Sequence, residues 1–157
     1  PHIVLPFIAV NSLAGETYGV EVAADWRLRR EQWRLRAAYT YLEMQLHVAP
    51  GVDPQLEGAE GESPAHQLSL WSSLNPRRDL QLDCVARFVD RLPFHQHIGR
   101  YLGLDLRLGW VPHPDLEIAL AGRNLLDDHH PEFQAFFIDT LPTETERSAY
   151  STVTWKF

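Results

Sequence analysis

The last ten residues, 148–157, alternate between two kinds of side chain. One face of this segment carries Val153, Trp155 and Phe157, and the other carries Tyr150 and polar residues. A two-residue period is that of a β-strand. Aromatic side chains at a strand end are typical of an outer-membrane strand leaving the hydrocarbon, whereas frayed termini of soluble domains are usually polar. A terminal strand in a soluble sheet would give the same alternation. The choice between a membrane strand and a soluble strand therefore depends on the rest of the chain.

The same period predicts seven further strands. They cover residues 2–10, 18–28, 33–41, 67–74, 80–88, 102–110 and 116–123. Apolar residues dominate one face of most of these segments, and charged residues of both signs lie on the other. Because a period of 2 fits where a period of 3.6 does not, a helical architecture is excluded. Pro6 cannot donate to a strand ladder, so we expect 2–10 to be an edge or interrupted strand.

The connections alternate in length. After a turn at 11–15, short turns at 29–32, 75–79 and 111–115 alternate with longer loops at 45–64, 89–99 and 125–146. Antiparallel up-and-down strands with tight turns at one rim and long loops at the other give this pattern in outer-membrane barrels. The loop 45–64 is rich in Gly, Pro and acidic residues, and we expect its acidic part, 53–62, to be solvated and mobile.

Four of the five tryptophans fall at the rim with the tight turns, namely Trp26, Trp33, Trp110 and Trp155. Indoles gathered at one level are typical of an aromatic girdle. The polar face carries both charge signs in near balance, as a wide barrel lumen does. We expect its arginines to pair with nearby acids rather than bind substrate: Arg27, Arg34, Arg36, Arg87 and Arg107.

Composition excludes several classes of protein. With 14 Lys and Arg against 21 Asp and Glu, the net charge of -7 argues against a general nucleic-acid binder. The single cysteine, Cys84, excludes an internal disulfide and a cysteine-based zinc site. No apolar run reaches about 18 residues, so no transmembrane helix is encoded. The chain starts at Pro1 without a signal peptide, and we expect a processed chain or a piece of a longer one.

Two other architectures compete with a membrane barrel segment. A soluble β-sandwich binding module explains the alternation equally well, but it explains less well the tryptophans at one end and strands of about 10 residues. A complete small eight-strand barrel, an anchor or adhesion module, would need a lumen packed tightly by side chains. The charge on the polar faces argues against it.

A specific resemblance lies at residues 122–133, Gly-Arg-Asn-Leu-Leu-Asp-Asp-His-His-Pro-Glu-Phe. This run resembles the Asn-Leu-Leu-Asp segment near the C-terminus of TonB-dependent outer-membrane receptors, which often continues in a similar His-Pro-Glu-Phe run. The family then has an Arg-led final strand ending in an aromatic residue, as 147–157 has here. The stretches 11–22 and 64–67 are also similar, so the resemblance covers essentially the whole chain.

The resemblance implies an all-β fold, an antiparallel up-and-down transmembrane β-barrel segment with about eight strands of a larger barrel of about 22. Residues 1–157 would be the C-terminal portion, without the family's plug, TonB-contacting box and earlier strands. It implies location in the bacterial outer membrane, contact with lipid and lipopolysaccharide, and import of a ferric siderophore or similar scarce ligand with the TonB complex. It implies neither an enzyme nor a resident cofactor.

Two groups of residues are singled out by the resemblance. Tyr150, Val153, Trp155 and Phe157 resemble the recognition signal for the barrel-assembly machinery. The family motif is Asn124, Leu125, Leu126 and Asp127. We expect Asn124 and Asp127 to cap or turn the chain as it leaves a strand.

Histidines gather at the end with the long loops. His95, His97, His129 and His130, with His47 and His66, could contact a metal chelate, since imidazole is a common ligand. We favour the alternative that they are solvated loop residues. Loop aromatics are further candidates for ligand contact: Tyr41, Phe94, Phe133, Phe136 and Phe137. No nucleophile–base pair or paired carboxylates stand out, so no catalytic site is predicted.

Overall fold

The computed structural model describes residues 10–29, 32–94, 98–132 and 144–157. Its elements are β1 (Leu13–Leu28), β2 (Trp33–Val48), the 3-10 helix η1 (Pro54–Glu62), β3 (His66–Arg77), β4 (Leu80–Val89), β5 (Tyr101–His113), β6 (Leu116–Arg123), β7 (His129–Pro131), β8 (Glu144–Glu146) and β9 (Ser148–Trp155). No helix within these ranges has the length and apolarity needed to cross a membrane. The predicted strand 2–10 lies outside the described residues.

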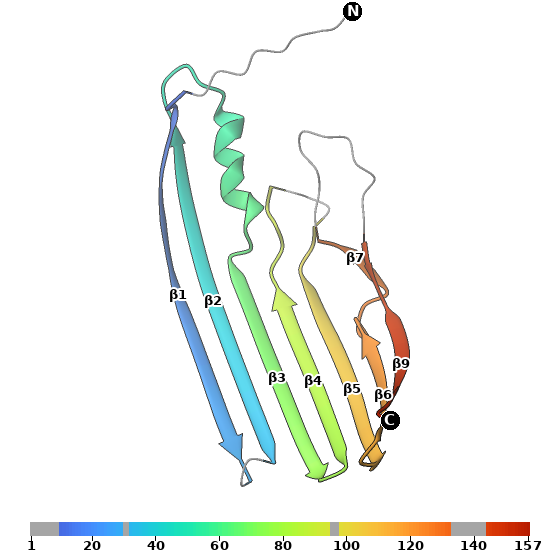
Figure 1. Cartoon of the computed structure of the whole chain (residues 1–157). Helices are drawn as coiled ribbons and strands as arrows, with labels where there is room; N and C mark the ends of the chain where they lie inside the picture. Colours follow the sequence, from blue (N-terminus) through green and yellow to red (C-terminus); the bar gives the residue numbers. More distant parts are fainter. Residues whose placement is uncertain (1–9, 30–31, 95–97, 133–143) are drawn as a thin grey trace, which may run out of the picture.

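Seven strands form one antiparallel sheet in the order β1-β2-β3-β4-β5-β6-β9. Each strand pairs with the next one along the chain, apart from the step from β6 to β9, which the small hairpin β7–β8 interrupts (Figure 1). The tight turns lie at one end of the sheet and η1 and the longer connections at the other. The prediction of an all-β, antiparallel up-and-down fold is confirmed.

The register brings the apolar faces of all seven strands together. In one row across the sheet, Leu70 lies opposite Ala86, and Ala86 lies opposite Leu104. In a row nearer the tight turns, Leu82 lies opposite Leu108 and Leu108 opposite Leu120. A slip of one residue would move every side chain to the other face, so this continuity depends on the exact pairing.

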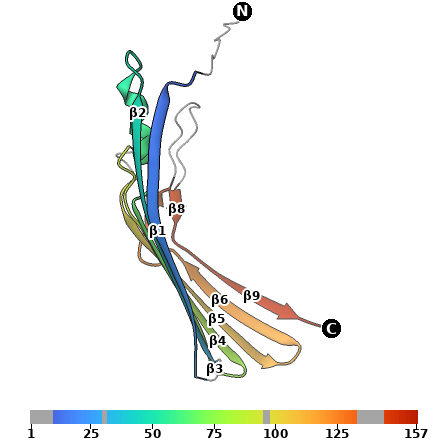
Figure 2. The ribbon, with the colours of Figure 1, turned by 90° about the vertical axis from the view of Figure 1, so that its left-hand side faces the viewer.

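The apolar face is bare. Leu68, Leu102 and Leu120 are 47%, 48% and 58% exposed, and no large side chain of the described residues is fully buried. Figure 2 shows the sheet edge-on as a single curved layer, and no described element covers its leucine rows. This arrangement contradicts the soluble β-sandwich, in which the same leucines would pack against a second sheet.

The tryptophans lie where the alternation predicts. Trp26, Trp110 and Trp155 point from the apolar face near the tight turns and are 47%, 43% and 69% exposed. The indole nitrogen of Trp110 donates to Asp79 in the adjacent turn at 3.3 Å. Trp33, on the same face, donates to Ser72 at 2.9 Å. Each indole thus has an apolar body on the bare face, and two have their polar N–H satisfied, as interfacial indoles require.

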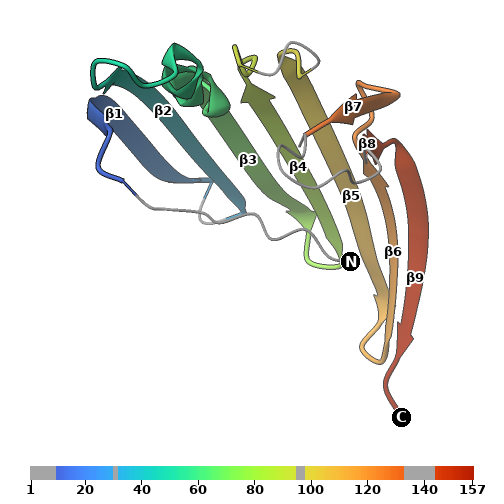
Figure 3. The same ribbon diagram turned by 90° about the horizontal axis from the view of Figure 1, so that it is seen from above.

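The sheet is curved but open. β1 and β9 form its two edges and do not pair with each other (Figure 3). The described strands therefore do not close into a small barrel. Each edge presents a row of backbone groups that a further strand would satisfy.

Strand ends differ from the sequence prediction. Leu13, Ala14 and Gly15 were expected in a turn, but they belong to β1 and pair with β2 residues 46–48. The loop expected from residue 45 begins only after Val48. Pairing extends both strands together, because each supplies the other's backbone partners, and this outweighs the turn propensity of Asn11, Ser12 and Gly15.

The acidic segment 53–62 contains η1 and is mostly exposed, as expected for a solvated segment, and several of its carboxylates contact the backbone. Asp53 caps the start of η1 by accepting from the backbone N–H of Gln55. Glu57 accepts from the backbone N–H of Val48 at 3.0 Å, and Glu60 accepts from that of Leu46. β3 begins only at His66, so these carboxylates satisfy the part of the β2 edge that β3 does not reach.

Phe94 holds η1 in place. Its backbone N–H donates to the carbonyl of Gly61 at 3.2 Å, and its ring lies against Gly58. A methyl group at position 61 would collide with the backbone nitrogen of Phe94. The close approach therefore requires glycine at this position.

We predict that Gly61→Ala displaces η1 and frees the β2 edge, at a cost of about 1–3 kcal/mol from the forced shift. Hydrogen exchange at the backbone amides of Leu46 and Val48 should become faster. The control is Gly99→Ala, where an added methyl meets open space. Unchanged exchange in Gly61→Ala would contradict the role of this contact.

Candidate functional site

The polar face carries cross-strand ion pairs. Arg107 lies 3.4 Å from Asp83 and 2.7 Å from Glu117, which links β4, β5 and β6. Arg34 pairs with Asp25 at 2.5 Å. Arg36 and Arg87 also pair with acids, so the expected pairing is confirmed for four of the five named arginines.

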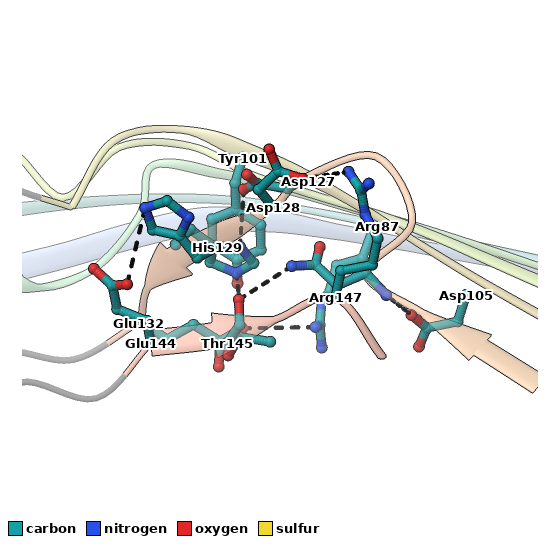
Figure 4. A network of polar contacts seen from close by, with 12 residues as sticks. Arg87, Tyr101, Asp105, Asp127, Asp128, His129, Glu132, Glu144, Thr145 and Arg147 are labelled. Atoms are coloured by element: carbon teal, nitrogen blue, oxygen red, sulfur yellow. Dashed lines mark hydrogen bonds and ion pairs between the residues drawn. The ribbon is translucent and has the colours of Figure 1, made fainter. Parts of the chain in front are cut away.

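The hairpin β7–β8 folds over the loop end of this face. Here Arg87 of β4 and Tyr101 and Asp105 of β5 meet Glu132 and Thr145 of the hairpin region (Figure 4). Between them is a hollow of about 290 Å³. It is lined by Val85, Arg87, Gly103, Asp105, Arg123, Asn124, His130, Glu132 and Thr145. Its lining combines charged and polar side chains from the sheet and from the hairpin region.

Asn124 turns the chain out of β6. Its φ of 51° is in the left-handed region, which asparagine tolerates better than most residues. Its backbone N–H donates to Asp105 at 2.9 Å, and its side-chain Nδ2 donates to the carbonyl of Thr145 at 3.2 Å. The residue is only 4% exposed. The expected turn role of Asn124 is confirmed, and it also ties the turn to the hairpin.

His130 is the centre of the hairpin's contacts. Its Nδ1 lies 3.0 Å from a carboxylate oxygen of Asp127, and its Nε2 lies 3.3 Å from one of Glu132. Its ring stacks on Tyr101, with 3.9 Å between the ring centroids. Both nitrogens can donate at once only when the ring carries two protons. Asp127 donates its backbone N–H to the Asn124 carbonyl at 3.4 Å, which closes the expected turn, and its carboxylate contacts His130.

Glu132 joins the hairpin to the sheet wall. The hydroxyl of Tyr101 donates to it at 3.2 Å, and the guanidinium of Arg87 lies 3.7 Å away. Arg147 closes the base of the hairpin, because it pairs with Asp128 at 2.8 Å and donates its backbone N–H to the Asp128 carbonyl. Among the described residues, the hairpin contacts the wall through these polar groups and through the stack of His130 on Tyr101.

The predicted loop histidines behave differently from one another. His130 is 7% exposed, so the interpretation as a solvated residue is wrong for it. His129 is exposed and lies 4.0 Å from Glu144. His95 and His97 fall outside the described residues. Within the parts of the chain that the structure describes, no three His, Cys, Asp or Glu side chains are placed to hold a metal ion.

The remaining candidates are spread over both faces. Leu125 donates its backbone N–H to Leu104, and Leu126 is 56% exposed. Val153 and Trp155 lie on the bare apolar face of β9, while Tyr150 lies on the polar face beneath the guanidinium of Arg123. Phe157 follows β9 and is fully exposed. The assembly signal assigned to these four C-terminal residues stays a prediction.

Sequence reasoning missed Tyr101, Glu132 and Thr145 as members of the site. Tyr101 and Arg87 share the polar face through the β4–β5 register, which sequence spacing does not supply. The one signal in the sequence was that Tyr101 and Arg87 alternate with apolar residues along their strands. Phe133, Phe136 and Phe137 lie outside the described residues, and Tyr41 donates to Glu43 at 2.9 Å.

We predict that Asn124→Ala destabilises the folded protein more than Asn124→Gly. Both variants lose the bond to Thr145, worth about 1 kcal/mol. Only alanine adds the cost of a left-handed backbone, about 1–2 kcal/mol. Urea unfolding of the protein in detergent measures the difference, and equal midpoints for the two variants would show that the backbone conformation carries no cost.

We predict that His130→Ala loosens the hairpin by about 1–3 kcal/mol, because Asp127 loses its partner, Glu132 loses one of three, and the stack on Tyr101 is removed. Hydrogen exchange at residues 144–146 should quicken while the strands of the sheet keep their protection. His129→Ala is the matched control, and its exposed side chain should change stability by less than about 0.5 kcal/mol. Equal effects of the two substitutions would refute the assignment.

Comparison with known proteins identifies the fold. No protein-family model and no curated protein matches the sequence. The crystal structure of the siderophore receptor PiuA from Acinetobacter baumannii matches 91% of this chain and 22% of that one, with 20% identity and a TM-score of 0.69. The ferric yersiniabactin uptake receptor FyuA from Yersinia pestis matches 94% of this chain and 24% of its own, with 16% identity and a TM-score of 0.69.

The chain thus spans about a quarter of the length of the solved structures that it matches. At these identities the similarity establishes the fold. The predicted likeness to the barrel of TonB-dependent receptors is confirmed at that level, and the described strands have the arrangement of a segment of such a barrel.

Proposed function

We propose that the chain forms the C-terminal part of the outer-membrane barrel of a TonB-dependent receptor. The observation that carries the proposal is the bare apolar face, continuous over seven strands and bordered by tryptophans at the tight-turn rim. In water such a face is unfavourable, at about 25 cal/mol for each Å² of apolar surface. Against lipid it costs nothing, and indoles at its rim lie in the interface.

The polar face supports a lumen wall. It holds ion pairs, two hollows near the hairpin and the hairpin itself, all on the side opposite the bare leucines. A small barrel filled by side chains would need apolar packing there. We therefore place the polar face toward a wide water-filled interior and the hairpin at the extracellular mouth.

The proposed task of the whole receptor is import of a ferric siderophore or a similar scarce ligand, powered through the TonB complex. The two solved structures with this fold are siderophore receptors by name. Contacts of this chain with lipid, lipopolysaccharide and the barrel-assembly machinery follow from the same proposal.

The deciding experiment uses the full-length gene product. It should fractionate with the outer membrane and migrate faster on gels without heating than after heating, as folded barrels do. Deletion of the gene should slow growth under iron limitation, and ferric chloride in excess should restore it. A protein found in the soluble fraction would refute the proposal, while outer-membrane location without an iron phenotype would refute only the ferric cargo.

We predict that Leu106→Arg lowers the amount of folded protein in the outer membrane. An arginine that faces lipid near the midplane costs about 2–4 kcal/mol. Val85→Arg is the matched control. Leu106 and Val85 are 38% and 37% exposed, but Val85 lies on the polar face opposite Asp105. The measurement is the amount of heat-modifiable protein in the membrane fraction. Equal tolerance of both substitutions would contradict a lipid-facing leucine row.

A further inference from the structure

His130 lies between two carboxylates at the place where the hairpin meets the wall. Its Nδ1 lies 3.0 Å from Asp127, in the turn after β6, and its Nε2 lies 3.3 Å from Glu132, directly after β7. An ionised carboxylate can only accept hydrogen bonds. Both contacts are therefore hydrogen bonds only when each ring nitrogen carries a hydrogen, and the docked hairpin is matched to the imidazolium form of the ring.

A neutral His130 ring cannot satisfy both carboxylates. One of its nitrogens then presents a lone pair to a carboxylate oxygen at 3.0 or 3.3 Å, and two acceptors that face each other repel. The residue is only 7% exposed, so water has little room to enter between them. Loss of the second proton therefore weakens the docking of the hairpin, whichever nitrogen gives it up.

The charges around the ring leave one negative charge for His130 to balance. Among the described residues, those that contact the ring or line the hollow with it are three acids and two arginines: Asp105, Asp127, Glu132, Arg87 and Arg123. The arginines oppose a further positive charge, and Arg87 lies 3.7 Å from the same oxygen of Glu132 that the ring contacts. The acids exceed them by one, so a cationic ring makes the group neutral.

The remaining neighbours of the ring add no opposing charge. Tyr101 of β5 stacks on it with 3.9 Å between the centroids, and the face of an aromatic ring carries partial negative charge. Thr145 lies opposite His130 in β8 and is neutral. The two glutamates of β8, Glu144 and Glu146, alternate with Thr145 and so lie on the other face of the hairpin.

The hairpin has little else to hold it in place. β7 and β8 have three residues each, and a two-stranded hairpin is at best marginally stable by itself. Apart from the Glu132 and His130 contacts, the described residues tie it to the sheet through the side chain of Asn124, which donates to the Thr145 carbonyl. A change in the charge of one ring can therefore decide the position of the hairpin.

We propose that docking of the β7–β8 hairpin against β4 and β5 is linked to the uptake of one proton by His130. In the docked state the ring holds a proton on each nitrogen. In a released state the ring is in water, where an ordinary imidazole gives up its second proton at about pH 6.5. Below that pH both states hold the proton, and docking has its full strength.

Above that pH the docked state binds one proton more than the released state, so docking weakens as the pH rises. The ratio of docked to released hairpin falls by up to about tenfold for each pH unit, until the docked ring also loses its proton. Release uncovers the hollow beneath the hairpin. Under the proposed function the hairpin lies at the extracellular mouth, and the pH outside the cell then sets how far this hollow is open.

Hydrogen exchange of the full-length protein in detergent tests the linkage between about pH 6 and about pH 9, where ordinary carboxylates stay ionised. Rates are divided by the intrinsic rate at each pH. Protection of residues 144–147 should fall by up to about tenfold per pH unit above about pH 7, while the strands of the sheet keep theirs. His130→Gln should remove the pH dependence. His129→Gln, at the exposed neighbouring histidine, is the matched control and should keep it.

Glu132→Gln is a second test, because glutamine can present either its oxygen or its NH₂ group to the ring. This variant should keep the hairpin docked over the whole range. Constant protection of 144–147 in the unaltered protein would refute the linkage, as would a pH-dependent fall that persists in His130→Gln. If His130→Gln never docks its hairpin, a fall that persists in Glu132→Gln refutes the linkage instead. Each of these results can occur in protein that fractionates with the outer membrane, so each leaves the proposed function standing.

Discussion

The structure depends on one constraint, which is that the apolar face of a single sheet meets no protein. Among the described residues, few side chains are buried, and those are small or lie at the edges of the sheet, such as Ala119, Ala121 and Ile98. The hydrophobic effect therefore does not hold this chain together as it holds a globular domain. Ladder hydrogen bonds and cross-strand pairs define the sheet, and they are strongest where water is excluded. The alternation, the register and the row of indoles are all consistent with an apolar face that meets no protein.

Backbone N–H groups that lie beyond the end of a neighbouring strand need another acceptor. The β2 edge above β3 is an example, because the carboxylates of Glu57 and Glu60 accept from its free N–H groups. The end of β6 is another, where Asp105 accepts from the N–H of Asn124. At both places an acidic side chain accepts a hydrogen bond from a backbone N–H that no neighbouring strand reaches. Acidic residues near the loop end thus have a structural explanation that needs no cation.

The two-residue period was enough to predict the faces of the strands in the main sheet and their order, because a sheet with one apolar and one polar face imposes that period on every strand. Strand ends were predicted less well, since pairing with β2 extends β1 through Gly15 despite local turn propensity. In the site, Asn124 could be predicted from its motif and its tolerance of a left-handed turn. The stack of His130 on Tyr101 could not, because only the register brings these residues together.

The polar face has two parts with different charge balance. Across β4, β5 and β6, Arg107 has two acids, Asp83 and Glu117, so this part of the wall is neutralised from within. Across β1 and β2 the ratio is reversed, with two arginines on Asp25. Exposed ion pairs contribute little in open water, so the imbalance is tolerable in an isolated sheet.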